Sequence, residues 1–306
     1  MIASNHIRLI TLSENTVKWL WLKGEWGLSI LVETDGIKVL VDTGLGDTII
    51  HNAHAMGIDL STIDRIVLSH GHTDHTGGLR DTLEAMRATV GHSNFLNKRD
   101  GEVEIIAHPD VWGPKYMKHA NEPEYDFRGI PFQLLELEER QGARFKYSRE
   151  PVWLNEDIVW SGEIPMRNDF ETIAAICTLK VNDGKYGDGD AEFIPDPVDD
   201  DAALYIRTDL GLVIVLGCAH HGMINTIHHA QETTGVEKVH MVVGGTHLIK
   251  ASDYQMESTI NELKRLGVEK VGVSHCTGLE SSVKLSQALG PDVFFFNNAG
   301  NVVIFE

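Results

Sequence analysis

The sequence HGHTDH at residues 70–75 places three imidazoles and one carboxylate within six residues, directly after the apolar run IDRIVL at 63–68. The run predicts a short buried strand. Residues two apart in an extended segment point to the same side, so the first two histidines should face one way. Asp74 and His75 lie where the chain turns toward the next helix, and they should point elsewhere. Packing alone gives no reason to gather these groups, so the stretch predicts metal binding.

The pattern favours two adjacent metal positions, because four such residues are more than one metal takes from one loop. The first pair of histidines would bind one ion, and Asp74 with His75 the other. The missing ligands should come from other strand ends, where His220 stands in GCAHHG and His275 in SHCTG. Cys218 occupies a strand end where a metal-bridging acid could sit, so it is either a further ligand or a small buried side chain.

Composition narrows the range of partners. The chain has 306 residues, of which 42% are hydrophobic and 23% charged, as is ordinary for a soluble globular protein. A formal net charge of −19 argues against nucleic acid and anionic membrane surfaces, which bind clustered Lys and Arg. A small substrate, including a phosphorylated one, stays compatible with this charge. Three cysteines without paired spacing, no signal-peptide pattern and no membrane-length apolar run predict a cytoplasmic protein.

The chain repeats one pattern twice. Residues 28–44 (LSILVETDGIKVLVDTG) and 202–218 (AALYIRTDLGLVIVLGC) each predict a β-hairpin. After each hairpin come a helical periodicity and a buried strand that enters a histidine-containing loop. Two β-β-α-β-like halves can bury their apolar strands as two sheets packed face to face, with helices outside. We therefore expect an α/β fold, a four-layer αββα sandwich, formed by a single domain over residues 1–306.

The remaining segments give weaker patterns. The same periodicities predict helices at 79–90, 223–233 and 256–266, strands at 103–107, 157–162, 239–243 and 268–273, and a final pair of strands in VFFFNNAGNVVIF at 293–305. Residues 182–201 are rich in Gly, Asp and Pro, which predicts a solvated acidic loop. This loop and residues 115–141 should form pocket walls. The aromatic-rich stretch at 16–26 is either an edge of the core or a subunit contact, which leaves a homo-oligomer open.

HGHTDH matches the H-x-H-x-D-H signature of the metallo-β-lactamase superfamily, and Asp42-Thr-Gly44 resembles the first motif of that superfamily. One branch is resembled more closely, the one typified by the dihydropterin–(ribofuranosyl)aminobenzene 5′-phosphate synthase. The stretches that carry this second resemblance are Gly27–Leu31, Ser69–Leu79, Gly217–Asn225, Gly244–Leu248 and Ser274–Gly278. The resemblance runs from about residue 7 to 305, and its motif is far more specific for the fold than for the reaction.

The resemblance implies a complete set of metal ligands, and it also shows where this chain differs from many related hydrolases. It assigns His70, His72 and His220 to one metal and Asp74, His75 and His275 to the other, with Asp42 hydrogen-bonded to a ligand histidine. Zinc is the expected ion, and manganese and iron are alternatives. Where many superfamily hydrolases have Gly-His and a bridging Gly-Asp, this chain has Gly162-Glu163 and Gly217-Cys218. A hydroxide alone could then bridge the metals, or the site could hold a single ion.

Our primary hypothesis is metal-assisted hydrolysis of a small ester, lactone or phosphoester, because paired cations acidify a bound water. Asp74 would orient that water, and His247 and His108 would donate hydrogen bonds to developing negative charge. We also predict that the substrate contacts three residues near strand ends, Glu163, Asn225 and Thr277.

Three alternatives stay open. The metals could stabilise a pyrophosphate leaving group while an aminobenzene attacks a dihydropterin methylene, with a phosphate at the helix N-terminus near Gly222-Met223. A di-iron oxygen or NO reductase would typically have a carboxylate in place of His72 and an attached flavin domain, and the chain has neither. A structural zinc site would be closed and rich in thiolates, unlike the imidazole and carboxylate set found here.

Overall fold

The computed structural model describes residues 1–87, 101–118, 124–174, 177–181 and 192–305. Its first sheet runs, in spatial order, through β18 (Val302–Ile304), β1 (Ile7–Ser13), β2 (Ser29–Thr34), β3 (Lys38–Val41), β4 (Arg65–Val67), β5 (Val103–Ala107) and β8 (Ala143–Tyr147). Its second sheet runs through β17 (Phe294–Phe296), β16 (Lys270–Ser274), β15 (Val239–Gly245), β14 (Gly211–Leu216), β13 (Ala203–Thr208), β10 (Ile158–Trp160) and β9 (Val152–Trp153). The two sheets face each other across a shared apolar layer.

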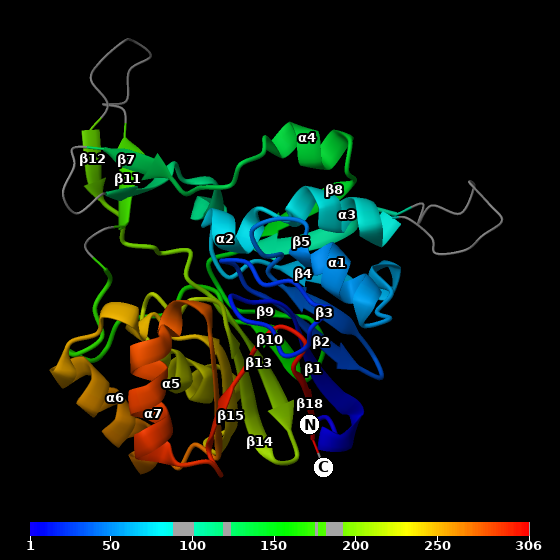
Figure 1. Ribbon diagram of the computed structural model, residues 1–306. Helices are drawn as coiled ribbons and strands as arrows, with labels where there is room; N and C mark the ends of the chain where they lie inside the picture. Colours follow the sequence, from blue (N-terminus) through cyan, green and yellow to red (C-terminus); the bar gives the residue numbers. More distant parts are fainter. Residues whose placement is uncertain (88–100, 119–123, 175–176, 182–191, 306) are drawn as a thin grey trace.

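Helices cover the outer face of each sheet (Figure 1). The first sheet is covered by α1 (Thr48–Ala55), α3 (Leu79–Arg87) and α4 (Leu134–Glu139), and the second by α5 (Met223–Thr234), α6 (Asp253–Leu266) and α7 (Leu279–Leu289). The predicted four-layer sandwich is therefore confirmed. None of the helices in the described part of the chain combines the length and apolar character that crossing a bilayer requires.

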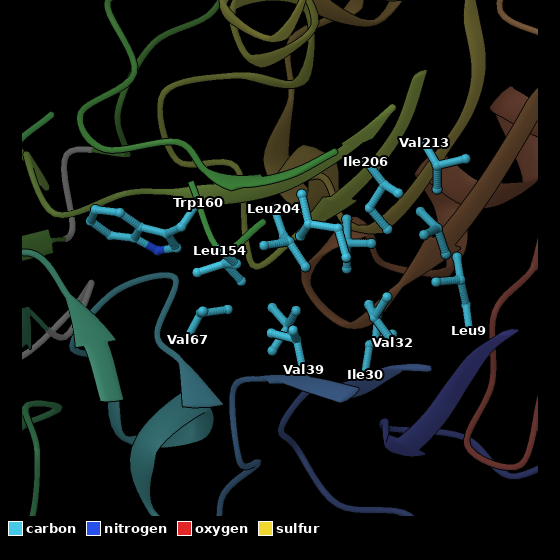
Figure 2. Close-up of a cluster of buried hydrophobic side chains, with 14 of the residues drawn as sticks. Leu9, Ile30, Val32, Val39, Val67, Leu154, Trp160, Leu204, Ile206 and Val213 are labelled. Atoms are coloured by element: carbon cyan, nitrogen blue, oxygen red, sulfur yellow. The ribbon is translucent and has the colours of Figure 1, made fainter. Parts of the chain in front are cut away.

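Strand alternation explains how each sheet buries both faces. In β2, Ile30 and Val32 point into the layer between the sheets, whereas Leu31 packs against the helices outside. In β13, Leu204 and Ile206 point inward in the same way. Figure 2 shows side chains from the two sheets meeting in this central layer. Each fully buried aliphatic side chain contributes about 1.5–3 kcal/mol, so this layer fixes how the sheets face each other.

The two predicted halves share one topology. The β2–β3 hairpin is followed by β4 and β5, which run parallel to β3. The β13–β14 hairpin is followed by β15 and β16, which run parallel to β14. Because parallel strands end at the same edge of a sheet, the loops after β14, β15 and β16 gather at one edge of the second sheet. The loop after β4, in the first sheet, meets them there, since His70, His72 and His75 lie close to Cys218 and His220.

Several expectations about individual segments need correction. The two C-terminal strands do not pair with each other, because β17 joins β16 and β18 joins β1. The helix predicted at 79–90 ends at Arg87 in the described residues, and the remainder lies outside them. Residues 115–141 are not all loop, since they include α4 and the strands β6 (Lys115–Lys118) and β7 (Tyr125–Phe127).

The predicted acidic loop at 182–201 also needs correction. Residues 182–191 lie outside the described residues, but the remainder contains β12 (Glu192–Pro195), which pairs with β11 (Cys177–Val181) in a four-stranded sheet with β6 and β7. Beyond β12, Asp196, Asp200 and Asp201 are buried rather than solvated. Their carboxylates find partners inside the protein, which composition alone could not reveal.

The aromatic stretch at 16–26 is largely exposed, and Leu22 is its one side chain among the buried hydrophobic residues. Trp19 and Trp21 are 48% and 58% exposed, and Leu20 between them is fully exposed. The two indole rings stack on each other with centroids 5.7 Å apart. The alternative interpretation of this stretch, a contact between subunits, stays a prediction.

The N-terminus of α5 is closed by a carboxylate from a distant loop. Glu171 is buried, and its Oε1 and Oε2 accept hydrogen bonds from the backbone amides of Ile224 (2.8 Å) and Asn225 (2.9 Å). Gly222 makes this possible, because it has a φ of 98° and a Cβ there would lie 2.2 Å from the Glu171 carboxyl carbon. A negative charge at a helix N-terminus is favourable, and both amides would otherwise lack a partner.

We expect Glu171→Ala to lower the free energy of unfolding by about 1–2 kcal/mol, because two buried amides lose their acceptor. Glu171→Gln keeps one acceptor oxygen and should lose less. Urea unfolding followed by circular dichroism measures both effects. As a matched control, Ser252→Ala removes the exposed cap of α6, in which Oγ accepts from the Gln255 amide, and should also cost about 1 kcal/mol. An unchanged midpoint for Glu171→Ala would contradict the capping role.

Candidate metal centre

The histidine-rich loop follows β4 and leads into the short helix α2 (Thr73–Thr76). His70 and His72 point toward each other, with the Nε2 of His70 2.9 Å from the Nδ1 of His72. Gly71 between them packs against the chain at Val111, where a Cβ would lie only 2.0 Å from the carbonyl oxygen. Any other residue at position 71 would push the loop away, so the sequence His-Gly-His is a requirement of packing as well as of chemistry.

The first candidate ligand group contains His70, His72 and His220, whose ring nitrogens lie within 4.8 Å of one another. All three residues are buried or nearly so, and burial lowers the pKa of each, that of His72 to about 3. Each imidazole is therefore neutral at pH 7, which is the form that binds a metal. Both ring nitrogens of His220 are buried without a hydrogen-bond partner among the described residues. A buried nitrogen without a partner is costly, and a metal ion at this position would provide one.

The second candidate ligand group contains Asp74, His75 and His275, again within 4.8 Å. The Nε2 of His275 lies 3.2 Å from the Oδ2 of Asp74. Burial alone would raise the pKa of Asp74, but the hydrogen bond from His275 and the neighbouring imidazoles lower it overall. The carboxylate is thus ionised and available as a ligand. The two groups adjoin, since the ring centroids of His70 and His75 are 4.3 Å apart.

Cys218 lies between the two groups. Its Sγ is 3.0 Å from the Nε2 of His75, and together with His70 and His75 it forms a further group that could hold a metal. The residue follows β14 as Asp42 follows β3, so it stands at the equivalent strand end of the second half. Burial raises the pKa of this thiol, so a neighbouring cation would be needed to make it a thiolate ligand.

Buried polar residues orient the second group. The Oδ2 of Asp42 lies 2.7 Å from the Nδ1 of His75, as the family resemblance implied for this residue. Glu14 Oε1 accepts from the backbone amide of His275 (2.7 Å), and Asn15 Oδ1 lies 2.9 Å from its Nδ1. Sequence analysis missed Glu14 and Asn15, because they follow β1, more than 250 positions before His275, and belong to no motif.

The loops of this rim hold an uncommon backbone conformation. Among the described residues, positive φ values at non-glycine positions occur at Asp42, Val198, Ala219, His247 and His275. Left-handed backbone at such residues costs on the order of 1 kcal/mol each and persists where surrounding contacts enforce it. Four of the five adjoin or belong to the ligand groups. The geometry of the rim therefore lowers the stability of the fold, and contacts elsewhere compensate for it.

His247, a predicted catalytic residue, lies beside the first group. The centroid of its ring is 4.2 Å from that of His220, and its backbone amide donates to the Sγ of Cys276 (3.2 Å). Burial and the nearby His275 lower its pKa to about 4, so the imidazole is neutral at pH 7. A neutral imidazole can accept a proton or donate a hydrogen bond from its N–H.

The predicted substrate-binding residues fall into two sets. The buried His108 contacts Glu163 through its Nε2 (2.9 Å), and Glu163 lines a cavity of about 600 Å³ together with Arg149, Arg167 and His221. This position leaves both as candidate substrate contacts. By contrast, the side chains of Asn225 and Thr277 are buried and already form hydrogen bonds with neighbouring groups of the protein.

Asn225 donates to the carbonyl of His221 (2.8 Å) and accepts from the amide of Arg167 (3.0 Å). Thr277 Oγ1 donates to the carbonyl of Ser274 (2.7 Å) and accepts from Thr246 (2.9 Å). We therefore no longer propose these two residues as substrate ligands. The expected phosphate site at the start of α5 is wrong for a similar reason, since Glu171 already occupies the amides of Ile224 and Asn225.

Comparisons with known proteins identify the family of this chain. The model of the metallo-β-lactamase superfamily matches residues 27–95. The 7,8-dihydropterin-6-methyl-4-(β-D-ribofuranosyl)-aminobenzene-5′-phosphate synthase of Methanocaldococcus jannaschii is 34% identical over 312 residues, which cover 98% of this chain and 97% of the relative.

Solved structures give the same result. A crystal structure of a metal-dependent hydrolase of the β-lactamase superfamily superposes with a TM-score of 0.77 and 25% identity, covering 97% of this chain and 98% of the other. Human tRNase Z, short form, shares the fold alone, with a TM-score of 0.52 and 10% identity over 98% and 99% of the two chains. The chain therefore belongs to the metallo-β-lactamase superfamily and, within it, to the family of the dihydropterin–ribofuranosyl-aminobenzene phosphate synthase.

Proposed function

We propose that this protein is a metal-dependent transferase that condenses a dihydropterin pyrophosphate with 4-(β-D-ribofuranosyl)aminobenzene 5′-phosphate. The observation that carries the proposal is the 34% identity to the named synthase over nearly the full length of both chains. Metal chemistry alone led us to predict hydrolysis, and the comparisons support condensation better. Both reactions need the same metal-binding rim, so the change concerns the substrate and not the site.

We propose that the rim binds two divalent ions. His70, His72 and His220 would hold one ion, and Asp74, His75 and His275 the other, with zinc expected before manganese or iron. The fit of these residues to a metal is supported by their donor set and by the two ring nitrogens of His220, which have no hydrogen-bond partner within the described part of the chain. Bound cations would stabilise the negative charge that develops on a departing pyrophosphate.

In this reaction the bond between the dihydropterin methylene and pyrophosphate breaks, and a bond from the aminobenzene to that methylene forms. The aminobenzene loses one proton in the exchange, so a proton acceptor is needed near the rim. His247 is suited to this role, because its imidazole is neutral at pH 7 and lies beside His220. Asp74, ionised and hydrogen-bonded to His275, would help to hold the reacting groups in register.

A half-exposed indole beside the rim supports a flat aromatic substrate. Trp26 is 51% exposed, and its ring centroid lies 5.2 Å from that of the candidate ligand His275. The residue precedes Gly27, whose close approach to Leu45 and Asp74 ties this part of the chain to the histidine-rich loop. Exposed aromatic faces bind planar heteroaromatic rings by offset stacking, and a dihydropterin is such a ring.

Hydrolysis stays the second candidate, on one observation. The metal-dependent hydrolase with a TM-score of 0.77 shares the fold over nearly its whole chain and is 25% identical to this one. A reaction in which water replaces the aminobenzene would use the same ligand groups. The experiments below separate the two reactions.

When the metal-replete protein is incubated with both condensation substrates, the condensation product and pyrophosphate should appear at equal rates. Chromatography and mass spectrometry can measure both rates. His72→Ala should lower the rate by at least about 100-fold, because it removes a metal ligand. A matched variant, His51→Ala, changes a histidine of α1 outside the rim and should keep the rate. Absence of product, together with cleavage of lactone or phosphodiester substrates, would favour hydrolysis instead.

Elemental analysis of the purified protein should find two divalent ions for each chain. His275→Ala should retain about one, because the His70, His72 and His220 group stays complete. Dialysis against a chelator should abolish activity, and zinc or manganese should restore it. Retention of two ions by His275→Ala would contradict the ligand assignment, and a metal-free active protein would contradict the proposed centre.

Trp26→Ala should raise the KM for the dihydropterin substrate by about 3- to 10-fold, since an aromatic pair contributes about 0.5–1.5 kcal/mol. Trp26→Phe keeps an aromatic face and should lose less. The KM for the aminobenzene substrate should change little, which distinguishes stacking on the pterin from a general disturbance. Equal effects on both KM values would contradict this assignment.

A further inference from the structure

Two consecutive buried aspartates lie between the loops that carry the first ligand group. Asp200 Oδ2 accepts a hydrogen bond from the backbone amide of Gly71, at 2.7 Å. Asp201 Oδ2 accepts from the backbone amide of His221, at 2.8 Å. Both residues are essentially inaccessible to solvent, with exposures of 1% and 0%. One short segment therefore binds the histidine loop of the first half and the histidine loop of the second half at the same time.

A buried lysine completes this arrangement. Lys115, only 2% exposed, extends from β6 and donates from Nζ to Asp200 Oδ1 (2.7 Å) and to Asp196 Oδ2 (3.2 Å). Its side chain also lies against the histidine loop, because a Cβ on Gly71 would be 3.1 Å from Lys115 Cε. A buried carboxyl group is expensive without a partner, and the lysine ammonium provides one for Asp200.

The backbone of the same segment is bonded to the rim as well. The amide of Ala202 donates to the carbonyl of Ser69 (2.8 Å), directly before His70. Residues 200–202 are thus fixed to the histidine loop by both a side chain and the main chain. This explains why so acidic a segment is buried rather than solvated.

These bonds adjoin one ligand group and not the other. Gly71 lies between His70 and His72, and His221 follows His220, so all three residues of the first group stand next to an anchored amide. The second group has its own supports, in which Asn15 and Glu14 hold His275 and Asp42 holds His75. Asp42 also supports the first group, because its Oδ2 accepts from the hydroxyl of Ser69, and that Oγ lies 2.9 Å from the Nδ1 of His70. Asp200 and Asp201 therefore support the first group, Glu14 and Asn15 support the second, and Asp42 supports both.

We propose that Asp200 and Asp201, with Lys115 as counter-ion, are positioning residues that set the affinity of the His70, His72 and His220 site independently of its neighbour. The inference rests on the proposed metal centre and does not depend on which reaction the centre catalyses. It also gives the third, four-stranded sheet a role, since β6 delivers the lysine to the rim.

Stepwise titration of the apoprotein with Co²⁺, with the visible spectrum and a competing chelator as readouts, tests the proposal through the metal itself. Asp200→Asn and Asp201→Asn should each lower the Co²⁺ affinity of the His70, His72 and His220 site by about 10- to 100-fold. The affinity of the second site should stay within about twofold of that of the unaltered protein. Asn15→Ala is the matched control, because it removes a support of His275 and should weaken the other site instead. Circular dichroism checks that each variant is folded, and Lys115→Met should resemble Asp200→Asn.

Three outcomes would overturn the proposal. If Asp200→Asn, Asp201→Asn and Lys115→Met bind both ions with the affinities of the unaltered protein, these residues do not position the ligands. If they weaken both sites equally while remaining folded, the effect is general and the two sites are not supported separately. If the unaltered protein binds no Co²⁺, the proposed metal centre is wrong, and so is the positioning role of Asp200, Asp201 and Lys115. If it binds two ions but forms no condensation product, only the proposed reaction is contradicted, and the positioning role stands.

Discussion

The packing of two sheets face to face is the constraint on which the rest of this structure depends. Strands such as β2 and β13 alternate between a central apolar layer and an outer layer of helices, so neither sheet can shift or rotate without exposing one of them. That fixed relation brings the ends of β4, β14 and β16 to one rim. Candidate ligands separated by 201 positions, Asp74 and His275, thereby meet within a few ångströms.

Burial of charge at this rim has a cost that the surrounding residues offset. The carboxylates of Glu14, Asp42, Asp200 and Asp201 each accept at least one backbone amide hydrogen bond. Hydrogen bonds of this kind offset part of the desolvation penalty that a buried carboxyl group incurs. The left-handed backbone at Asp42, His247 and His275 indicates that the fold also accepts strain in order to aim these side chains. A rim of this kind is organised before any substrate arrives.

The same organised rim can serve hydrolysis or condensation, because the nucleophile is the main difference between them. Two further side chains at the rim of this chain bear on the choice. A thiol, Cys218, stands where a bridging acid would be expected, and an indole, Trp26, is exposed beside the ligand His275. At the N-terminus of α5, Glu171 already accepts from the amides of Ile224 and Asn225, so these two amides are not open to a phosphate. A cavity of about 600 Å³ lined by Arg149, Arg167 and Glu163 also reaches His221, the residue after the candidate ligand His220.

The local sequence by itself determined most of the helices and strands and pointed to the central candidate ligands. Alternating apolar residues predicted the two hairpins, and HGHTDH predicted a metal-binding loop, because both signals depend only on neighbours in the chain. Only the tertiary structure decided the contacts that orient those ligands. No motif in the sequence marks the residues that make these contacts, which are Glu14, Asn15, Lys115 and Asp200. The sequence does not distinguish an aspartate in a solvated loop from one that is buried against a lysine. Burial and partners come from segments far away in the chain, and no local pattern records them.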